Sequence, residues 1–133
     1  MEHGARCGHV RRALDPARDG GPSIEVHFAV LPALARNKKA DPVLFLAGGP
    51  GQSAMALAGP LSQMLARFGN RRDIVLVDQR GTGRSAALVC DDDRGALPLR
   101  DSFDPQRQAQ RALQCLARLQ ALPHGDLRQY TTA

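Results

Sequence analysis

Two short apolar runs, each ending in a glycine-rich turn, constrain the fold of this 133-residue chain more than any other feature. The first run is Val43 to Ala47, followed by Gly48 to Gly51, and the second is Ile74 to Val77, followed by a turn over residues 79–85. Short apolar runs bounded by turn residues are typical of strands buried on both faces. The segment between them has room for a helix, so the sequence predicts a β-α-β unit of a parallel sheet in an α/β fold.

The two turns are also the candidate functional region. Ligands of parallel sheets bind where strands end at their C-terminal edge, and both turns fall at such ends. Glycine has no Cβ and lets backbone N–H groups approach a ligand closely. Gly48-Gly49-Pro50-Gly51 holds more glycine than a tight strand-to-helix turn needs, which favours a functional role over a purely structural one.

Both turns resemble the motifs of one protein family. Ala47-Gly48-Gly49-Pro50-Gly51 resembles the H-G-G-P-G loop of α/β-hydrolases related to proline iminopeptidase and the tripeptidyl aminopeptidases, and the stretch from Asp78 to Ser85 matches their D-Q-R-G-x-G-x-S motif. The motifs stand in the family's order and at about its spacing, and a weaker resemblance extends from about Cys7 to Thr132. Ala47 replaces the family's His, as in many relatives on the tripeptidyl-aminopeptidase side.

The resemblance implies that residues 1–133 are the N-terminal portion of a single α/β-hydrolase domain. That portion has an antiparallel edge hairpin, followed by parallel strands with flanking helices. The implied activity is an aminopeptidase that releases residues or short peptides from peptide N-termini through an acyl-enzyme on a serine. By this resemblance, Gly49 is expected to supply an oxyanion N–H from a loop that includes Gly48. Gln52 directly follows that loop in the sequence and is a candidate for contact with the substrate. Two alternatives stay open: an esterase or other hydrolase of this fold, and a non-catalytic hydrolase-like piece that needs a second chain.

The remaining motif residues are expected to be structural: Pro50, Gly51, Asp78, Gln79, Arg80, Gly81, Gly83 and Ser85. Asp78 and Arg80 are expected to pair in a buried hydrogen-bonded network. Gly83-Arg84-Ser85 lacks the final glycine of a nucleophile elbow, which indicates a turn role for Ser85. The G-x-G-x-x-A pattern that begins at Gly81 does not follow its strand directly, which argues against a dinucleotide site.

The catalytic machinery of such a hydrolase is incomplete in this sequence. No G-x-S-x-G occurs in the 133 residues, and the resemblance places the nucleophile, the acid, the catalytic His and the substrate-recognising cap after Ala133. We therefore expect the chain alone to be inactive. We also expect its half-sheet to be marginally stable or prone to aggregation, because it leaves an unpaired edge.

The rest of the chain supports the same architecture. Cys7–Leu14 and the alternating segment Ser23–Leu31 read as a hairpin across a Pro- and Gly-rich turn. In the second strand, Ile24, Val26, Phe28 and Val30 form the apolar face, and Glu25, His27 and Ala29 form the other. His27 is expected to be solvated or to have a cross-strand role.

Two helices are predicted from apolar spacing. The first covers residues 54–68, is delayed or interrupted by Gly59-Pro60, and places Met64 and Phe68 in the core. The second starts at Asp104-Pro105, with Asp as N-cap and Pro in the first turn, and ends near Pro123-His124-Gly125. Its apolar face consists of Ala112, Cys115, Leu116, Leu119 and Leu122.

The net charge of the chain does not by itself identify a class of partner. The formal charge is +5, but the basic residues are scattered along the sequence and lack aromatic neighbours, so no nucleic-acid partner is expected. No apolar run is long enough to predict a membrane span, and the first residues lack the apolar core of a signal peptide. Full-length relatives are often periplasmic or secreted. The expected partner is a peptide or ester substrate, and the oligomeric state stays open.

The chain has three cysteines, so at least one remains unpaired if two of them form a disulfide. Cys90 and Cys115 are the expected pair, as in disulfide-bonded relatives, with free buried thiols as the alternative. Cys7 with His3 and His9 has no second ligand pair, so no metal site is expected there. Asp91-Asp92-Asp93 is expected to be a solvated loop. Neither a metal nor a cofactor is predicted.

Overall fold

The computed structural model describes residues 4–49, 51–90 and 103–130. It divides into two compact units, residues 1–87 and residues 88–133, and each is described by itself. The first unit contains the strands and the candidate site. Asp91-Asp92-Asp93 and Pro50 lie outside the described residues, as do His3 and the end of the Tyr130-Thr131-Thr132 segment.

The first unit starts with an antiparallel hairpin of β1 (Arg6–Ala13) and β2 (Ser23–Leu31). The amide of Leu14 donates to the carbonyl of Pro22 at 2.8 Å and closes the predicted turn. His9 and His27 are directly opposite each other, with ring centroids 5.4 Å apart. His27 therefore has the cross-strand position expected of it, with its Nε2 3.7 Å from Glu25 Oε2.

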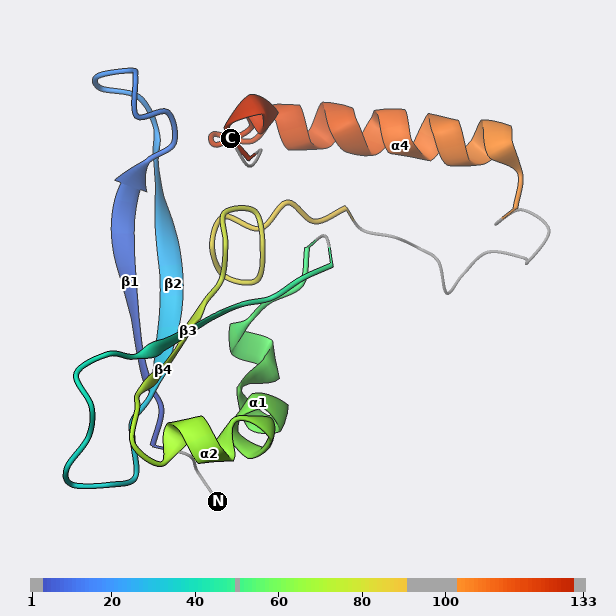
Figure 1. Cartoon of the computed structure of the whole chain (residues 1–133). Helices are drawn as coiled ribbons and strands as arrows, with labels where there is room; N and C mark the ends of the chain where they lie inside the picture. Colours follow the sequence, from blue (N-terminus) through green and yellow to red (C-terminus); the bar gives the residue numbers. More distant parts are fainter. Residues whose placement is uncertain (1–3, 50, 91–102, 131–133) are drawn as a thin grey trace. The chain divides into compact units, whose positions relative to one another are not determined.

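Two parallel strands complete the sheet. β3 (Val43–Leu46) pairs in parallel with β4 (Ile74–Val77), and β4 also pairs antiparallel with β2. The strand order is β1-β2-β4-β3, so the result is an open, mixed four-stranded sheet with helices, an α/β arrangement (Figure 1). The predicted β-α-β unit and the hairpin are confirmed. The run at 43–47 was expected to be buried on both faces, but β3 is an edge strand of this sheet, and Leu44 and Leu46 are exposed on it.

The core lies on one face of the sheet. Ala29 and Leu31 of β2 and Ile74 and Leu76 of β4 pack there against Ala54 and Leu61 of the connecting segment. The division of β2 into an apolar and a polar face is therefore wrong in the second half of the strand, because Ala29 lies on the face assigned as polar and is 3% exposed; in the first half, Ile24 of the apolar face is buried as expected. Pairing with β4 places this half of β2 inside the sheet, where the face that carries Ala29 and Leu31 is the one the helices cover.

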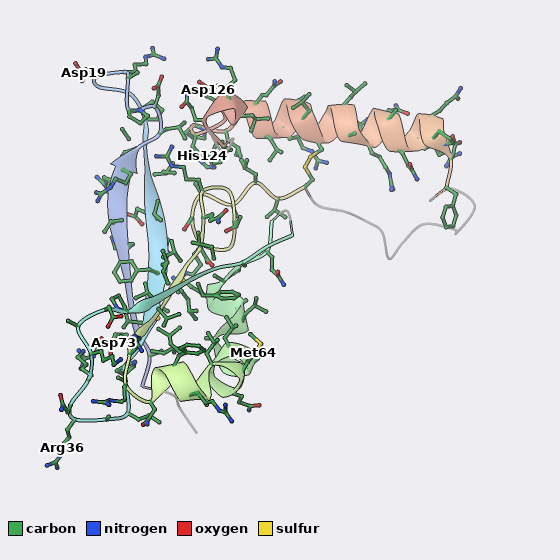
Figure 2. The ribbon with its side chains drawn as sticks, in the orientation of Figure 1. Asp19, Arg36, Met64, Asp73, His124 and Asp126 are labelled. Carbon is green, nitrogen blue, oxygen red and sulfur yellow. A yellow bond between two sulfur atoms is a disulfide. The ribbon has the colours of Figure 1, made fainter. Side chains whose placement is uncertain are left out.

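The connecting segment forms three short helices: the 3₁₀ helix η1 (Met55–Leu57), α1 (Ala58–Met64) and α2 (Ala66–Gly69). Pro60 lies in the first turn of α1, where its missing N–H costs no hydrogen bond, so it delays the α-helix as predicted. The core positions of Met64 and Phe68 are wrong, since their exposed fractions are 70% and 54%. Figure 2 labels Met64 on the first unit. Leu65 leaves the helical conformation and ends α1, and Leu61 and Leu65 pack on the sheet instead.

The loop before β3 is fastened to the start of β4 by Asp73. One carboxylate oxygen accepts from Lys38 Nζ at 2.6 Å, and the other accepts from the amide of Ala33 at 2.8 Å. The bond from Lys38 and then that from Ala33 hold the pKa of Asp73 below its ordinary value of 3.8. A carboxyl group with a lowered pKa in the folded state stabilises the fold above pH 3.8, and this contribution is lost as pH falls through the folded-state pKa.

We predict that Asp73→Asn lowers the urea midpoint of unfolding at pH 7. The difference from wild type should shrink as the pH falls through the lowered pKa of Asp73, because the wild-type carboxylate is then protonated too. Urea titrations followed by circular dichroism from pH 7 to pH 2.5 measure this. Asp19→Asn, an exposed residue of the hairpin turn, is the charge-matched control. A difference that stayed constant across the pH range would contradict the prediction.

The second unit contains α4 (Pro105–Gln120) and the 3₁₀ helix η2 (Leu127–Tyr130). Asp104 is the N-cap, and its side chain accepts from the amide of Gln106, with Pro105 at the first helical position. The predicted start of this helix is therefore confirmed. Its apolar face is partly covered at Cys115, Leu119 and Leu122, whereas Leu116 is 40% exposed.

Candidate oxyanion site

The two glycine-rich turns start side by side at one end of the sheet. Leu46, the last residue of β3, is in register with Val77, the last residue of β4. Because the two strands are parallel, the segments that follow them leave the sheet in the same direction at this point. The geometry brings together two motifs that are about thirty residues apart in the sequence.

The first turn exposes its backbone. Gly49 and Gly51 have positive φ angles of 78° and 86°, a region that side chains with a Cβ rarely adopt. The amide of Gln52 donates to the carbonyl of Gly49 at 3.3 Å and closes the turn. Gly48, Gly49 and Gln52 are exposed. The amide of Gly49 has no acceptor among the described residues, so it is free to donate to a ligand.

Asp78 joins the two turns. Its side chain is fully buried, and one carboxylate oxygen accepts from Ser53 Oγ at 2.8 Å and from the amide of Met55 at 3.0 Å. The other oxygen accepts from the amide of Arg84 at 3.1 Å. The first two donors follow the first turn, and the third belongs to the second turn. A single carboxylate therefore fixes both motifs, and we call this arrangement the Asp78 clasp.

The second turn is closed by its own backbone and packs on the clasp. The amide of Gly81 donates to the carbonyl of Ser85 at 2.8 Å, and the amide of Ser85 donates to the carbonyl of Thr82 at the same distance. Gly83, with φ of 51°, lies against the Asp78 carboxylate: a Cβ at this position would overlap that carboxylate and approach Ser53 Oγ to 2.8 Å. Gln79 accepts from Thr82 through its carbonyl and has an exposed side chain.

Ser85 connects the second turn to the hairpin. Its hydroxyl oxygen is buried and accepts from the amide of His27 at 2.8 Å, and the carbonyl of His27 accepts from the amide of Asp78 at 3.1 Å. The second turn thus continues the hydrogen bonding of β2 beyond the end of β4. A nucleophilic serine needs an exposed hydroxyl, and the burial of Ser85 agrees with a turn role.

Arg80 has a different partner from the expected one. Its Nη1 donates to the carbonyl of Leu14 at 3.0 Å, and among the described residues it forms no hydrogen bond or ion pair with Asp78. The expected Asp78–Arg80 pair is therefore wrong. Backbone and hydroxyl donors already satisfy the carboxylate, while the long guanidinium side chain reaches the buried start of the hairpin turn.

We predict that Arg80→Ala destabilises the fold by about 1.5–3 kcal/mol, because a charged donor to the carbonyl of Leu14 is lost. Chemical unfolding at pH 7 measures this change. Arg84→Ala is the matched control. It removes the same charge from the same turn, at a residue whose side chain is exposed. Equal unfolding midpoints for the two variants would contradict a bracing role for Arg80.

Sequence reasoning missed the donors of the clasp. Ser53 donates to Asp78 and also accepts from the amide of Ala56 at 3.0 Å, a bond of the kind that N-cap side chains make, although Ala54 is the N-cap of η1. Its position just before a helical segment was the available signal. The amides of Met55 and Arg84 gave no signal, because every residue except proline carries a backbone donor.

The expected pairing of the cysteines is present in the structure. Cys90 and Cys115 are joined by a disulfide, with Cα atoms 5.7 Å apart, and Cys7 is a free, exposed thiol. Among the described residues, no three side chains are arranged to hold a metal ion. A helix able to span a membrane is likewise absent from the part of the chain that the structure describes.

Comparisons with known proteins leave the chain without a family assignment. No family model matches it, and no curated protein is similar enough to count as a relative.

Proposed function

We propose that this chain provides the oxyanion loop of an α/β-hydrolase that releases residues or short peptides from peptide N-termini. The observation that carries the proposal is the exposed amide of Gly49, which has no acceptor among the described residues and lies at the C-terminal end of a parallel strand. The resemblance of both turns to the aminopeptidase motifs supports the same assignment.

The chemical role follows from that amide. When a serine attacks the scissile carbonyl, the carbonyl oxygen becomes an oxyanion, and a preorganised N–H donor stabilises it more than the ground state. Gly49 would supply one donor, and the residue after the nucleophile would supply the second. The nucleophile, the acid and the catalytic His would come from sequence other than these 133 residues, because no G-x-S-x-G occurs in them.

The Asp78 clasp suits this role because catalytic donors must be held in place. An oxyanion donor works by not having to reorganise during the reaction. The first turn is mostly glycine and has no side chains to anchor it, so its position depends on Ser53 and Met55, which follow it and bind Asp78. In this proposal, Asp78 is a positioning residue and not a catalytic one.

The substrate class rests on the resemblance and on Gln52. The exposed side chain of Gln52 follows the loop directly, where it could contact a substrate beside the oxyanion. Aminoacyl and tripeptidyl p-nitroanilides test the aminopeptidase assignment, and p-nitrophenyl esters test the esterase alternative. Turnover of esters alone would replace the first assignment by the second.

The experiment for the proposal uses the natural polypeptide that contains this sequence. It would be captured with an antibody against residues 103–130, labelled with a fluorophosphonate and digested for mass spectrometry. A labelled serine in a G-x-S-x-G peptide, in the same polypeptide or in one bound to it, is the expected result. A preparation that contains this sequence and no labelled serine would overturn the proposal.

For that labelled polypeptide we predict that Gly49→Ala lowers kcat at least ten-fold, with little change in KM. A Cβ at a φ of 78° is strained, so the peptide plane should rotate and move the donor away from the oxyanion. Steady-state kinetics on the best p-nitroanilide measures the change. Gly21→Ala in the hairpin turn, at a glycine without positive φ, is the control. An unchanged kcat would contradict the role of Gly49.

A second candidate is a hydrolase-like piece that binds a second chain without catalysis. The apolar edge strand β3 favours it, because Leu44 and Leu46 are 58% and 50% exposed and no strand among the described residues pairs with the outer edge. Apolar edges of this kind bind further strands. The same capture experiment distinguishes the candidates, since this one predicts a bound partner and no labelled serine.

A further inference from the structure

The end of the sheet opposite the two turns carries a surface formed by two segments. Residues 33–41 precede β3, and residues 67–73 precede β4, so both lie at the N-terminal ends of the parallel strands. Three backbone hydrogen bonds join them, from the amides of Leu34, Ala35 and Lys39 to the carbonyls of Gly69, Asn70 and Arg71, at 3.2, 2.8 and 2.7 Å. Segments far apart in the sequence thus form one continuous surface.

Most of the chain's excess positive charge is on this surface. The two segments contain six basic and two acidic residues, which gives a net charge of +4 out of +5 for the whole chain. Lys38 and Arg72 are neutralised by Asp73 and Asp41, at 2.6 and 3.0 Å. The other four cations are exposed and form no ion pair with a described carboxylate: Arg36, Lys39, Arg67 and Arg71. We call these four residues the basic patch. Figure 2 labels one of them, Arg36, whose side chain points away from the backbone.

The expectation that the charges are scattered therefore holds along the sequence but not in the fold. Arg36 and Arg71 are separated by 34 intervening residues, and the backbone bonds between their segments bring the two stretches together. Cations that are far apart in the sequence are therefore close together on the surface of the fold.

Apolar side chains are exposed within the same two segments. Leu34 is 85% exposed and Phe68 is 54% exposed. The amide of Leu34 bonds to the carbonyl of Gly69, the residue after Phe68, so both side chains come from backbone that is joined directly. Cations around exposed Leu and Phe are typical of surfaces that lie in the headgroup region of a membrane.

We propose that the basic patch, with Leu34 and Phe68, docks on an anionic phospholipid surface. The cations would face lipid phosphates and carboxylates, and the two apolar side chains would enter the boundary of the acyl chains. A nucleic acid would match the cations but would leave Leu34 in water, and one Phe does not make the series of stacking platforms that single strands require. This surface is at the opposite end of the sheet from the candidate oxyanion site, so docking would leave the turns accessible.

The test is binding of the 133-residue chain to vesicles of phosphatidylcholine with 30% phosphatidylserine, compared with phosphatidylcholine alone. The expected result is sedimentation with the anionic vesicles only, at 50 mM salt, and its loss at 500 mM salt. Each cation near an anionic surface contributes about five-fold in affinity, so Arg36→Gln/Lys39→Gln/Arg71→Gln should bind about a hundred-fold more weakly. Leu34→Ser should weaken binding about ten-fold while leaving the salt dependence unchanged.

The matched control is Arg12→Gln/Arg18→Gln/Arg118→Gln, which removes the same total charge from exposed positions outside the patch. It should bind like wild type. Equal weakening of both triple variants would overturn the proposal, because net charge alone would then explain the binding. Binding to a single-stranded oligonucleotide that the patch variant loses, without any binding of wild type to anionic vesicles, would also overturn it and would identify a nucleic acid as the occupant. Circular dichroism confirms that each variant is folded.

Discussion

Asp78→Ala is expected to destabilise the fold by about 3–5 kcal/mol, because it leaves three donors without their acceptor in a buried site. Small domains have total stabilities of about 5–15 kcal/mol, so this loss would remove a large share of the total. Urea unfolding at pH 7, followed by circular dichroism, measures it. Asp19→Ala removes the same charge from an exposed turn and should change the midpoint little (Figure 2).

Milder variants keep this prediction testable if Asp78→Ala does not fold. Asp78→Asn retains one acceptor oxygen and should be intermediate, and Ser53→Ala removes one donor and should cost about 1 kcal/mol. The order of stability is then wild type, Ser53→Ala, Asp78→Asn. If Asp78→Asn were as stable as Asp19→Asn, the clasp would have no energetic importance.

Gly83→Ala is expected to cost about 2–5 kcal/mol. The added Cβ would overlap the Asp78 carboxylate, and alanine is strained at a φ of 51°. Gly48→Ala is the matched control, because a Cβ there meets no atom within 4 Å and its φ is not positive. Thermal and urea unfolding measure the stability of the two variants. Gly83→Ala should be much less stable than Gly48→Ala by both methods.

A double variant separates the two causes of that cost. In the Asp78→Ala background the overlap with the carboxylate is gone and only the approach to Ser53 Oγ remains, so adding Gly83→Ala should cost less, mainly the backbone strain of about 1–2 kcal/mol. Full additivity of the two substitutions would contradict the contact between Gly83 and Asp78. Where the Asp78→Ala background is too unstable, the cycle is measured with a stabilising osmolyte present throughout.

The elements of this fold could be predicted from local sequence, whereas several packing details could not. Val43–Leu46 and Ile74–Val77 are apolar runs with turn residues after them, and Asp104-Pro105 is a helix start by residue type alone. Met64 and Phe68 were misplaced because the break at Leu65 changes which side of the helix faces the sheet, and no Gly or Pro marks that break. Helix ends set by tertiary packing leave little trace in composition.

The candidate site shows the same division. The glycines of both turns could be found from residue type, because a positive φ favours glycine. The partners of Asp78 could not be found in this way, since they are a hydroxyl 25 residues before it, a backbone amide 23 residues before it and another backbone amide 6 residues after it. In the sequence, Arg80 was the obvious charged partner for Asp78, yet its guanidinium donates to the carbonyl of Leu14. Charge complementarity identifies candidate pairs, and the fold decides among them.

The strand order β1-β2-β4-β3 has a consequence for synthesis. β3 leaves the ribosome before β4, but β4 is its neighbour in the sheet, so β3 has nothing to pair with until the helices and β4 have followed. The hairpin can form at once, whereas β3 waits as an apolar, unpaired segment during that interval. Because exposed apolar segments are where nascent chains associate wrongly, β3 is open to such association until residue 77 has been synthesised.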